Sequence, residues 1–355
     1  MKLIEKYFSY RLKREKIEKY LMNIEPETKT GEKSKKIKAA VVQRTIKPVK
    51  SVKDYLENIH AFVKQASEEN SDIVAFPEYN FFDLLGLIPG FNIFNNYLNK
   101  KAQKEFDKKK ANEVVRQDLS YLHALFASVA QPIQQAIEMI MADLAQKYQI
   151  YIYSGSYLIK EDDKLYNGGA LFSKEGRLIG RQKKLHLTDF EEDIGFSREN
   201  NLSVYHIDTA KITFPVCMDA TYFETFKIAR KKGADIVIIP IANNEEYSVY
   251  KALRGIWPRV QESYVYGLKP SLNGWIAGMY FSGKAGIFAP IGISVKNYGV
   301  LALAEHYEGD YLITSDMDLD KLDQVRNTSE YYGDINEEFE RDYYQKTYEG
   351  KFKSL

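Results

Sequence analysis

The chain has 355 residues, of which 45% are hydrophobic and 28% charged, a composition typical of one large globular domain or two smaller ones. Its 50 basic and 49 acidic residues nearly cancel, which argues against a global field that would recruit nucleic acid or an anionic membrane. A single cysteine excludes an intramolecular disulfide and any multi-cysteine metal site. Because no run approaches the roughly 18 apolar residues of a membrane span or the apolar block of a signal peptide, we expect a cytoplasmic protein.

Residues 1–36 predict a basic amphipathic helix followed by a polar linker, which we treat as the first unit of the chain. We expect this helix to dock on the main domain or on a second subunit, the alternative being contact with a membrane surface or nucleic acid. Its apolar positions, at near-helical spacing, are Leu3, Ile4, Tyr7, Phe8, Leu12, Ile17, Leu21 and Ile24.

From Ile37 the pattern changes to short apolar runs rich in Val and Ile that alternate with helical patterns. A strand over 37–43, a helix over 52–67 and a buried strand over 72–78 form a βαβ unit. An aromatic and glycine-rich loop is expected over 81–97, and a loop directly after a strand end is a natural pocket wall. A charged segment around 100–110 and a long helix through 142–147 follow.

The second half repeats the alternation of strands and helices. Strands are predicted over 149–159, 168–176 and 177–185, with a hairpin turn at 174–176. Strands over 203–217, a helix over 222–232 and a buried strand over 234–242 come next, then a helix over 247–266. Further strands are expected near 275–280, 285–289, 300–305 and 310–317. These elements predict an α/β sandwich over 37–326, in which two mostly β layers are covered by helices.

Residues 327–355 form a polar tail that carries seven aromatic side chains. An isolated tail would not need them, so we expect it to pack on a neighbouring surface at a subunit interface. The aromatic residues are Tyr331, Tyr332, Phe339, Tyr343, Tyr344, Tyr348 and Phe352.

Well-marked catalytic motifs are absent from the sequence. It contains no phosphate-binding loop, no G-x-G-x-x-G, no H-E-x-x-H and no G-x-S-x-G. These absences argue against nucleotide binding, zinc-protease activity and serine-hydrolase activity. The five histidines are scattered without the spacing of metal ligands.

The only cysteine, Cys217, ends the apolar run ITFPV and precedes a helical pattern. A thiol at a strand-to-helix junction lies near the positive end of the helix dipole, which favours the thiolate. The alternative is a small buried residue that fills the core.

Two charged residues could assist such a thiol. Glu78 closes the buried strand 72–78 at a proline, where open α/β sheets place their ligands, although a glutamate there could instead cap a helix or face solvent. Lys184 lies in the alternating stretch RQKKLHL, on the same face as Gln182 and His186, although most lysines in basic runs are solvated.

Three ordered motifs resemble those of the nitrilase superfamily of carbon–nitrogen hydrolases, in its amidase and carbamoylase branch. They are FPEY at 76–79, GRQKKLHL at 180–187 and VCMDATYFE at 216–224. AAVVQ at 39–43, GADIVIIP at 233–240, RVQESYVY at 259–266 and GVLALAE at 299–305 add to the similarity, which spans Lys38 to Arg326.

The resemblance implies a four-layer α-β-β-α sandwich that forms homodimers or larger homo-oligomers, and a mechanism without metal or cofactor. By this similarity Glu78 is the general base, Cys217 the nucleophile, and Lys184 the cation that stabilises the oxyanion together with the Met218 backbone N–H. A second glutamate is expected shortly after the lysine; Glu191 fits best, with Glu192 as the alternative.

The implied function is hydrolysis of a non-peptide carbon–nitrogen bond in a small molecule through a cysteine thioester. Met-Asp after the cysteine is closer to amidases and carbamoylases than to nitrilases, which favours an amide or N-carbamoyl substrate. The alternatives are hydrolysis of nitriles and a non-catalytic binding or scaffold role. Acidic residues in the expected pocket loops, Asp189, Asp219, Glu245 and Glu246, could attract an amine-bearing substrate, although most loops are polar.

Overall fold

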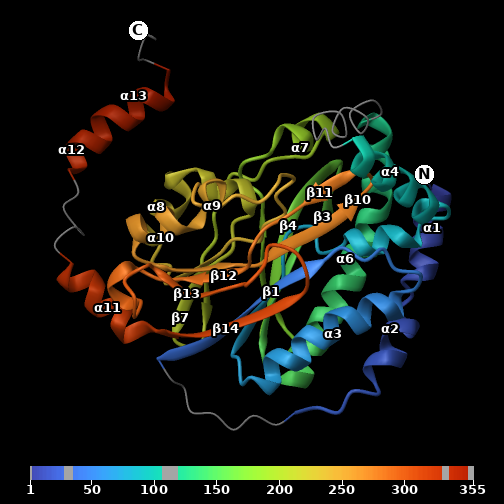
Figure 1. Ribbon diagram of the computed structural model, residues 1–355, viewed down its shortest axis with the longest axis horizontal. Helices are drawn as coiled ribbons and strands as arrows, with labels where there is room; N and C mark the ends of the chain where they lie inside the picture. The colour runs from blue at the N-terminus through green and yellow to red at the C-terminus, as the bar shows by residue number, and fades with distance from the viewer. Residues whose placement is uncertain (1, 28–34, 106–118, 330–335, 351–355) are drawn as a thin grey trace.

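The computed structural model describes residues 2–27, 35–105, 119–329 and 336–350. Two β-sheets stack face to face, and helices cover the outer face of each (Figure 1). The four-layer α-β-β-α sandwich predicted for the chain is therefore confirmed.

The first sheet has the strand order β11-β10-β1-β2-β3-β4-β5, with β14 antiparallel to β1. Its centre is parallel, because β1 pairs in parallel with both β2 and β10, and β2 pairs in parallel with β3. The strands are β1 (Lys36–Thr45), β2 (Ile73–Ala75), β3 (Tyr151–Glu161), β4 (Lys164–Phe172), β5 (Leu178–Lys183), β10 (Ser271–Ile276), β11 (Met279–Phe281) and β14 (Tyr311–Asp318).

The second sheet has the strand order β13-β12-β9-β8-β7-β6, with parallel pairing of β7, β8 and β9 at its centre. The strands are β6 (Tyr205–Ile207), β7 (Ala210–Thr213), β8 (Ile236–Ile238), β9 (Tyr266–Lys269), β12 (Gly286–Phe288) and β13 (Val300–Leu303). The predicted hairpin at 174–176 is confirmed in the first sheet, where β4 and β5 pair antiparallel and Gly176 has a φ of +76° that suits glycine.

Alternation of side chains along the central strands builds the core. In β1, Ala39 and Val41 point between the two sheets, while Ala40 and Val42 point toward the helices. Strands buried on both faces need apolar residues at every position, which explains the continuous runs in the sequence. Each fully buried Val or Ile side chain contributes about 1.5–3 kcal/mol.

Two long helices cover the first sheet, and shorter ones cover the second. Helix α3 (Val52–Glu68) begins at a capping box in which Ser51 and Asp54 satisfy each other's backbone N–H groups. Helix α6 (Leu119–Tyr148) packs along β3. On the other side lie α8 (Phe223–Lys231), α9 (Val249–Ala252) and α10 (Ile256–Ser263). No helix in the described ranges is both long and apolar enough to cross a membrane.

The N-terminal segment folds as two helices rather than the one expected, α1 (Lys2–Arg11) and α2 (Arg14–Leu21). Both pack on α6, and α2 also contacts α3. Phe8 and Ile17 are fully buried in the core between the first sheet and its helices. Most of the apolar stripe of the segment therefore lies against the body of the chain, whereas Leu3 is 83% exposed. Part of the expected linker, residues 28–34, lies outside the described residues.

Two sequence predictions for the regions around the site were wrong. The expected loop at 81–97 is largely helical, with the 3₁₀ helix η1 (Phe82–Leu87) followed by α4 (Phe91–Glu105). The helix expected over 247–266 is split into α9 and α10, and its end belongs to β9. Tyr266 is buried between the sheets, so packing overrides the helical pattern there. The rest of the charged segment, 106–110, lies outside the described residues.

The remaining elements are short, apart from a helix near the C-terminus. They are α7 (Asp189–Ile194), η2 (Cys217–Thr221), η3 (Ile291–Ile293), α11 (Leu319–Thr328), α12 (Glu337–Phe339), η4 (Glu340–Tyr344) and α13 (Gln345–Tyr348). The described part of the tail contacts α8 of its own chain, since Lys227 is ion-paired with Glu340 and the rings of Phe223 and Tyr344 lie 5.9 Å apart. Tyr331, Tyr332 and Phe352 lie outside the described residues.

Candidate active site

A pocket of about 450 Å³ opens where strands of both sheets end. Glu78 follows β2, Lys184 directly follows β5, and Cys217 follows β7, and all three line this pocket. Strand ends at such an edge are where α/β sheets bind ligands. The structure thus brings Glu78 beside Lys184 and Cys217, although Glu78 lies more than 100 positions before either of them along the chain.

Lys184 is held between two carboxylates. Its Nζ lies 2.8 Å from Glu78 Oε1 and 2.8 Å from Glu191 Oε2, and all three side chains are only 1% exposed. Glu191 is therefore the second glutamate beside the lysine. The alternative, Glu192, instead forms a surface ion pair with Arg198.

An asparagine that the sequence analysis did not single out bridges the two carboxylates. Asn167 in β4 donates from Nδ2 to Glu78 Oε1 at 2.9 Å and to Glu191 Oε1 at 2.8 Å. Tyr79 donates from its hydroxyl to Glu191 Oε1 at 2.6 Å, and the Ala242 N–H donates to Glu78 Oε2 at 3.0 Å. These donors fix both carboxylates. Tyr79 belongs to the motif FPEY, whereas Asn167 and Ala242 have no sequence signal, because they meet Glu78 only through the fold.

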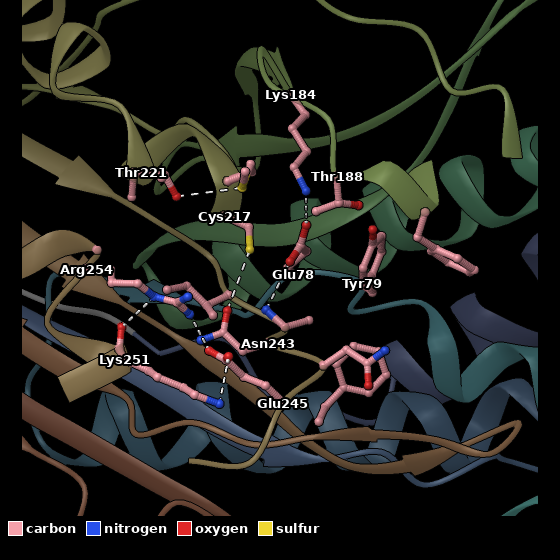
Figure 2. Close-up of a pocket in the computed structure, with 18 of the residues that line it drawn as sticks. Glu78, Tyr79, Lys184, Thr188, Cys217, Thr221, Asn243, Glu245, Lys251 and Arg254 are labelled. Carbon is pink, nitrogen blue, oxygen red and sulfur yellow. Dashed lines mark hydrogen bonds and ion pairs between the residues drawn. The ribbon is translucent and has the colours of Figure 1, made fainter. Parts of the chain in front are cut away.

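Cys217 occupies a backbone conformation that a side chain rarely adopts. Its φ is +45°, and its N–H donates to the Pro240 carbonyl at 3.1 Å. Such strain in a non-glycine residue often accompanies function. The thiol is partly open to the pocket, and its Sγ faces Asn243 Oδ1 at 4.0 Å, with Lys184 and Glu78 beside it (Figure 2).

Asp219 joins the lysine segment to the cysteine segment. It is fully buried, and its carboxylate accepts the Val216 N–H at 2.8 Å, the His186 N–H at 2.7 Å and the Leu185 N–H at 3.2 Å. Because one carboxylate satisfies backbone donors on both sides of the pocket, the spacing between Lys184 and Cys217 is fixed by the fold.

Burial and mutual charge shift the pKa values of the group. Burial and the Glu78 charge raise the pKa of the Cys217 thiol well above its usual value, while Lys184 opposes this shift. Burial raises the pKa of Glu78, although Lys184 opposes it. Burial disfavours the Lys184 ammonium, but Glu78 and Glu191 outweigh this and raise its pKa. Glu191 also loses solvation on burial, yet Lys184 and its hydrogen bonds lower its pKa, so its carboxylate stays ionised.

Two of the four acidic residues that were expected to attract an amine-bearing substrate, Asp219 and Glu245, are occupied by protein partners. Asp219 is engaged as described above, and Glu245 is ion-paired with Arg254 at 2.6 Å and with Lys251 at 3.4 Å (Figure 2). The Glu245 charge is therefore balanced by cations of the same pocket wall.

Curated proteins similar to this chain are hydrolases and amidases. The probable hydrolase YhcX of Bacillus subtilis (strain 168) is 23% identical over 298 residues, which cover 82% of this chain and 51% of YhcX, so the chain spans about half the length of that relative. The omega-amidase NIT2 of Homo sapiens is 22% identical over 300 residues, covering 81% of this chain and 90% of that protein.

Solved structures share the fold. A carbon-nitrogen hydrolase from Helicobacter pylori G27 superposes with a TM-score of 0.64 at 20% identity, covering 88% of this chain and 99% of that one. A mutant of the amidase from Nesterenkonia sp. AN1 superposes with a TM-score of 0.62 at 17% identity, covering 89% of this chain and 100% of that one. That structure shows covalent addition of the acetamide moiety of fluoroacetamide at the active site cysteine.

The family model that describes carbon-nitrogen hydrolases matches residues 38–327, which is most of the chain. The sandwich fold, the pocket at the strand ends and the amidase relatives agree with this match. The chain belongs to the carbon-nitrogen hydrolase family and is an enzyme of that class.

Proposed function

We propose that the enzyme hydrolyses a small amide or N-carbamoyl compound through a thioester on Cys217. One observation carries this proposal: the single cysteine of the chain shares a pocket with a buried Glu78–Lys184 ion pair. A nucleophile, a base and a cation are the groups that acyl transfer requires.

In the first step Cys217 Sγ attacks the substrate carbonyl carbon while Glu78 takes the thiol proton. Because Lys184 and the ionised Glu191 neutralise each other, Glu78 is the carboxylate left to accept this proton. The carbonyl electron pair moves to oxygen, and this oxyanion is stabilised by the Lys184 ammonium and the Met218 backbone N–H, which line the pocket.

Collapse of this intermediate breaks the carbon–nitrogen bond. Glu78 returns its proton to the nitrogen, the amine or ammonia leaves, and a thioester remains on Cys217. Water then gives a proton to Glu78 as its oxygen attacks the thioester carbon. The carbon–sulfur bond breaks, the thiolate recovers a proton from Glu78, and the acid product leaves. One residue thus acts alternately as base and acid.

Glu191 and Asn167 position the reacting groups. Glu191 holds Lys184 through a second ion pair, and Asn167 bridges the two carboxylates. Their proposed role predicts that conservative changes lower kcat while the folded structure and the reactivity of Cys217 toward small alkylating agents survive.

The proposal is tested by intact-protein mass spectrometry and ammonia release on a panel of small amides, N-carbamoyl amines and nitriles. The wild type is expected to form a Cys217 adduct or release ammonia with amides or carbamoyl compounds, and Cys217→Ala to do neither. Glu78→Gln is expected to lose about 10²–10⁴-fold in rate. Turnover of nitriles without the matching amides would replace the proposal with nitrile hydrolysis. Unchanged turnover by a folded Cys217→Ala would remove the thioester altogether.

Two neighbouring glutamates allow a specific role in catalysis to be distinguished from the general effect of removing a negative charge. Glu191→Gln removes the partner of Lys184, whereas Glu192→Gln removes a neighbouring carboxylate that binds Arg198 at the surface. The first is expected to lower kcat and the second to leave it within about twofold of wild type, because exposed ion pairs contribute little.

We also propose that the protein works as a homodimer in the cytoplasm. Support comes from the aromatic side chains of the tail, since Phe339 is 51% exposed and Tyr343 is 49% exposed although the tail contacts α8. Light scattering of the full chain and of Phe339→Ser tests this, with a monomeric wild type as the opposing result.

A further inference from the structure

A small recess adjoins the catalytic pocket where the chain passes from β9 to β10. Lys269 ends β9 and Ser271 begins β10, and side chains two residues apart on an extended backbone point the same way. Both line this recess of about 10 Å³, which shares Lys269 and Asn243 with the main pocket. Cys217 lines the main pocket and not the recess, so the recess is a separate space beside the catalytic groups.

Lys269 brings a buried positive charge to the recess. The residue is only 6% exposed. Within the described residues its ammonium has no carboxylate or carbonyl partner, and its ring contact is with Phe288, whose centroid lies 5.7 Å from Nζ. A buried charge without a counterion is costly, so its presence in the fold needs an explanation.

The other cations of the pocket wall are already compensated. Lys184 is paired with two glutamates, while Lys251 and Arg254 share Glu245. Glu245 also lines the recess, but its carboxylate is held by these two cations. Among the pocket cations in the described ranges, Lys269 is therefore the one that lacks a counterion.

Two neutral donors accompany the ammonium. Ser271 Oγ is buried and has no hydrogen-bond partner in the described part of the chain. A Cβ added at Gly283 would lie 2.5 Å from this oxygen, so only glycine there leaves the hydroxyl its place. Asn243 Oδ1 faces Cys217 Sγ at 4.0 Å, so the Nδ2 group of the same amide is directed away from the thiol (Figure 2). An ammonium, a hydroxyl and an amide N–H group thus line one recess.

The electrostatics of the recess are consistent with an anion site. Burial and the charge of nearby Lys284 lower the pKa of Lys269 to about 8, which still leaves it mostly protonated at neutral pH. An anion beside Nζ compensates this charge through a charge-assisted hydrogen bond. A water molecule satisfies the same donors but leaves the charge without compensation.

We propose that the recess binds one monatomic halide, such as chloride, between Lys269, Ser271 and Asn243. A space of about 10 Å³ holds about one water-sized group, so a carboxylate or phosphate, with several heavy atoms, is too large. The site goes beyond the proposed function, because the halide takes no part in the reaction. Its bond to Asn243 Nδ2 holds that amide with Oδ1 toward the Cys217 thiol.

Thermal unfolding of the full chain tests this inference without a substrate. Sodium chloride or sodium bromide replaces sodium gluconate in steps at constant ionic strength, and sodium formate serves as the small carboxylate. Lys269→Met removes the charge, whereas Gly283→Ala keeps the lysine and fills the recess. The matched control is Lys251→Met, which removes a pocket lysine that already has a counterion. Anomalous scattering from crystals grown in bromide locates the ion.

Chloride and bromide are expected to raise the Tm of the wild type and of Lys251→Met by at least about 2 °C, with saturation. Lys269→Met and Gly283→Ala should show no saturating shift, and bromide should lie within hydrogen-bond reach of Lys269 Nζ. A shift that survives in Lys269→Met, or no saturating shift in the wild type, would overturn the inference. An equal effect of formate, a bromide bound elsewhere, or only a water in the recess would do the same.

Discussion

Replacing Lys184 by methionine tests the electrostatics of the site most directly. The change leaves Glu78 and Glu191 as two buried carboxylates that have lost ion pairs of 2.8 Å each. Removing one partner of a buried ion pair costs about 3–5 kcal/mol, because a charge is left without compensation. The folded variant relieves part of this cost by taking up a proton, so the loss depends on pH.

The sign of that dependence follows from the direction of the shift. Without the ammonium, the folded-state carboxylate pKa lies above its unfolded value, so stability persists at low pH and is lost as pH rises through the folded pKa. We expect the difference in unfolding free energy between wild type and Lys184→Met to be larger at pH 8 than at pH 5.5, by about 1–3 kcal/mol.

Urea unfolding at the two pH values measures this difference, and Lys183→Met is the matched control. Lys183 is the adjacent residue, and it is ion-paired with Glu161 at 2.5 Å and with Glu199 at 3.5 Å, two carboxylates that are 51% and 29% exposed. Its removal should cost less than about 1 kcal/mol with little pH dependence. A Lys184→Met variant as stable as wild type at pH 8, or equally destabilised at both pH values, would refute the reasoning.

Three further changes follow from the packing and charges described above. Asn167→Leu removes the donor shared by both carboxylates, so kcat should fall about 100-fold from misplacement, while alkylation of Cys217 by iodoacetamide persists. Lys269→Met removes a buried ammonium with a lowered pKa, so urea unfolding at pH 7 should show a gain of about 1–3 kcal/mol. Only the wild type should become more stable as pH rises from about 8 toward 10.5. Phe8→Ala should cost about 3–5 kcal/mol in thermal unfolding, because Phe8 is fully buried, whereas Tyr10→Ala at a 57% exposed position should cost little.

The layers of the fold could be predicted because the buried strands can be recognised from their own apolar runs in the sequence. Continuous apolar runs such as 72–78 and 234–242 mark strands that are buried on both faces, and these became β2 and β8. Catalytic candidates at the ends of such runs then fall at one edge of the sandwich. We could predict that Glu78, Lys184 and Cys217 are neighbours because they follow strand ends and lie in three motifs that occur in the expected order.

The rest of the site depends on contacts that no local pattern contains. Asn167 lies in the middle of β4 and meets Glu78 across 89 positions of sequence. Lys269 follows a pattern that predicted an α-helix over 247–266, yet pairing of β9 with β8 makes Tyr266 the first residue of a strand that ends at Lys269. The burial that makes Lys269 unusual is a property of packing, so the sequence alone could not distinguish it from a solvated lysine.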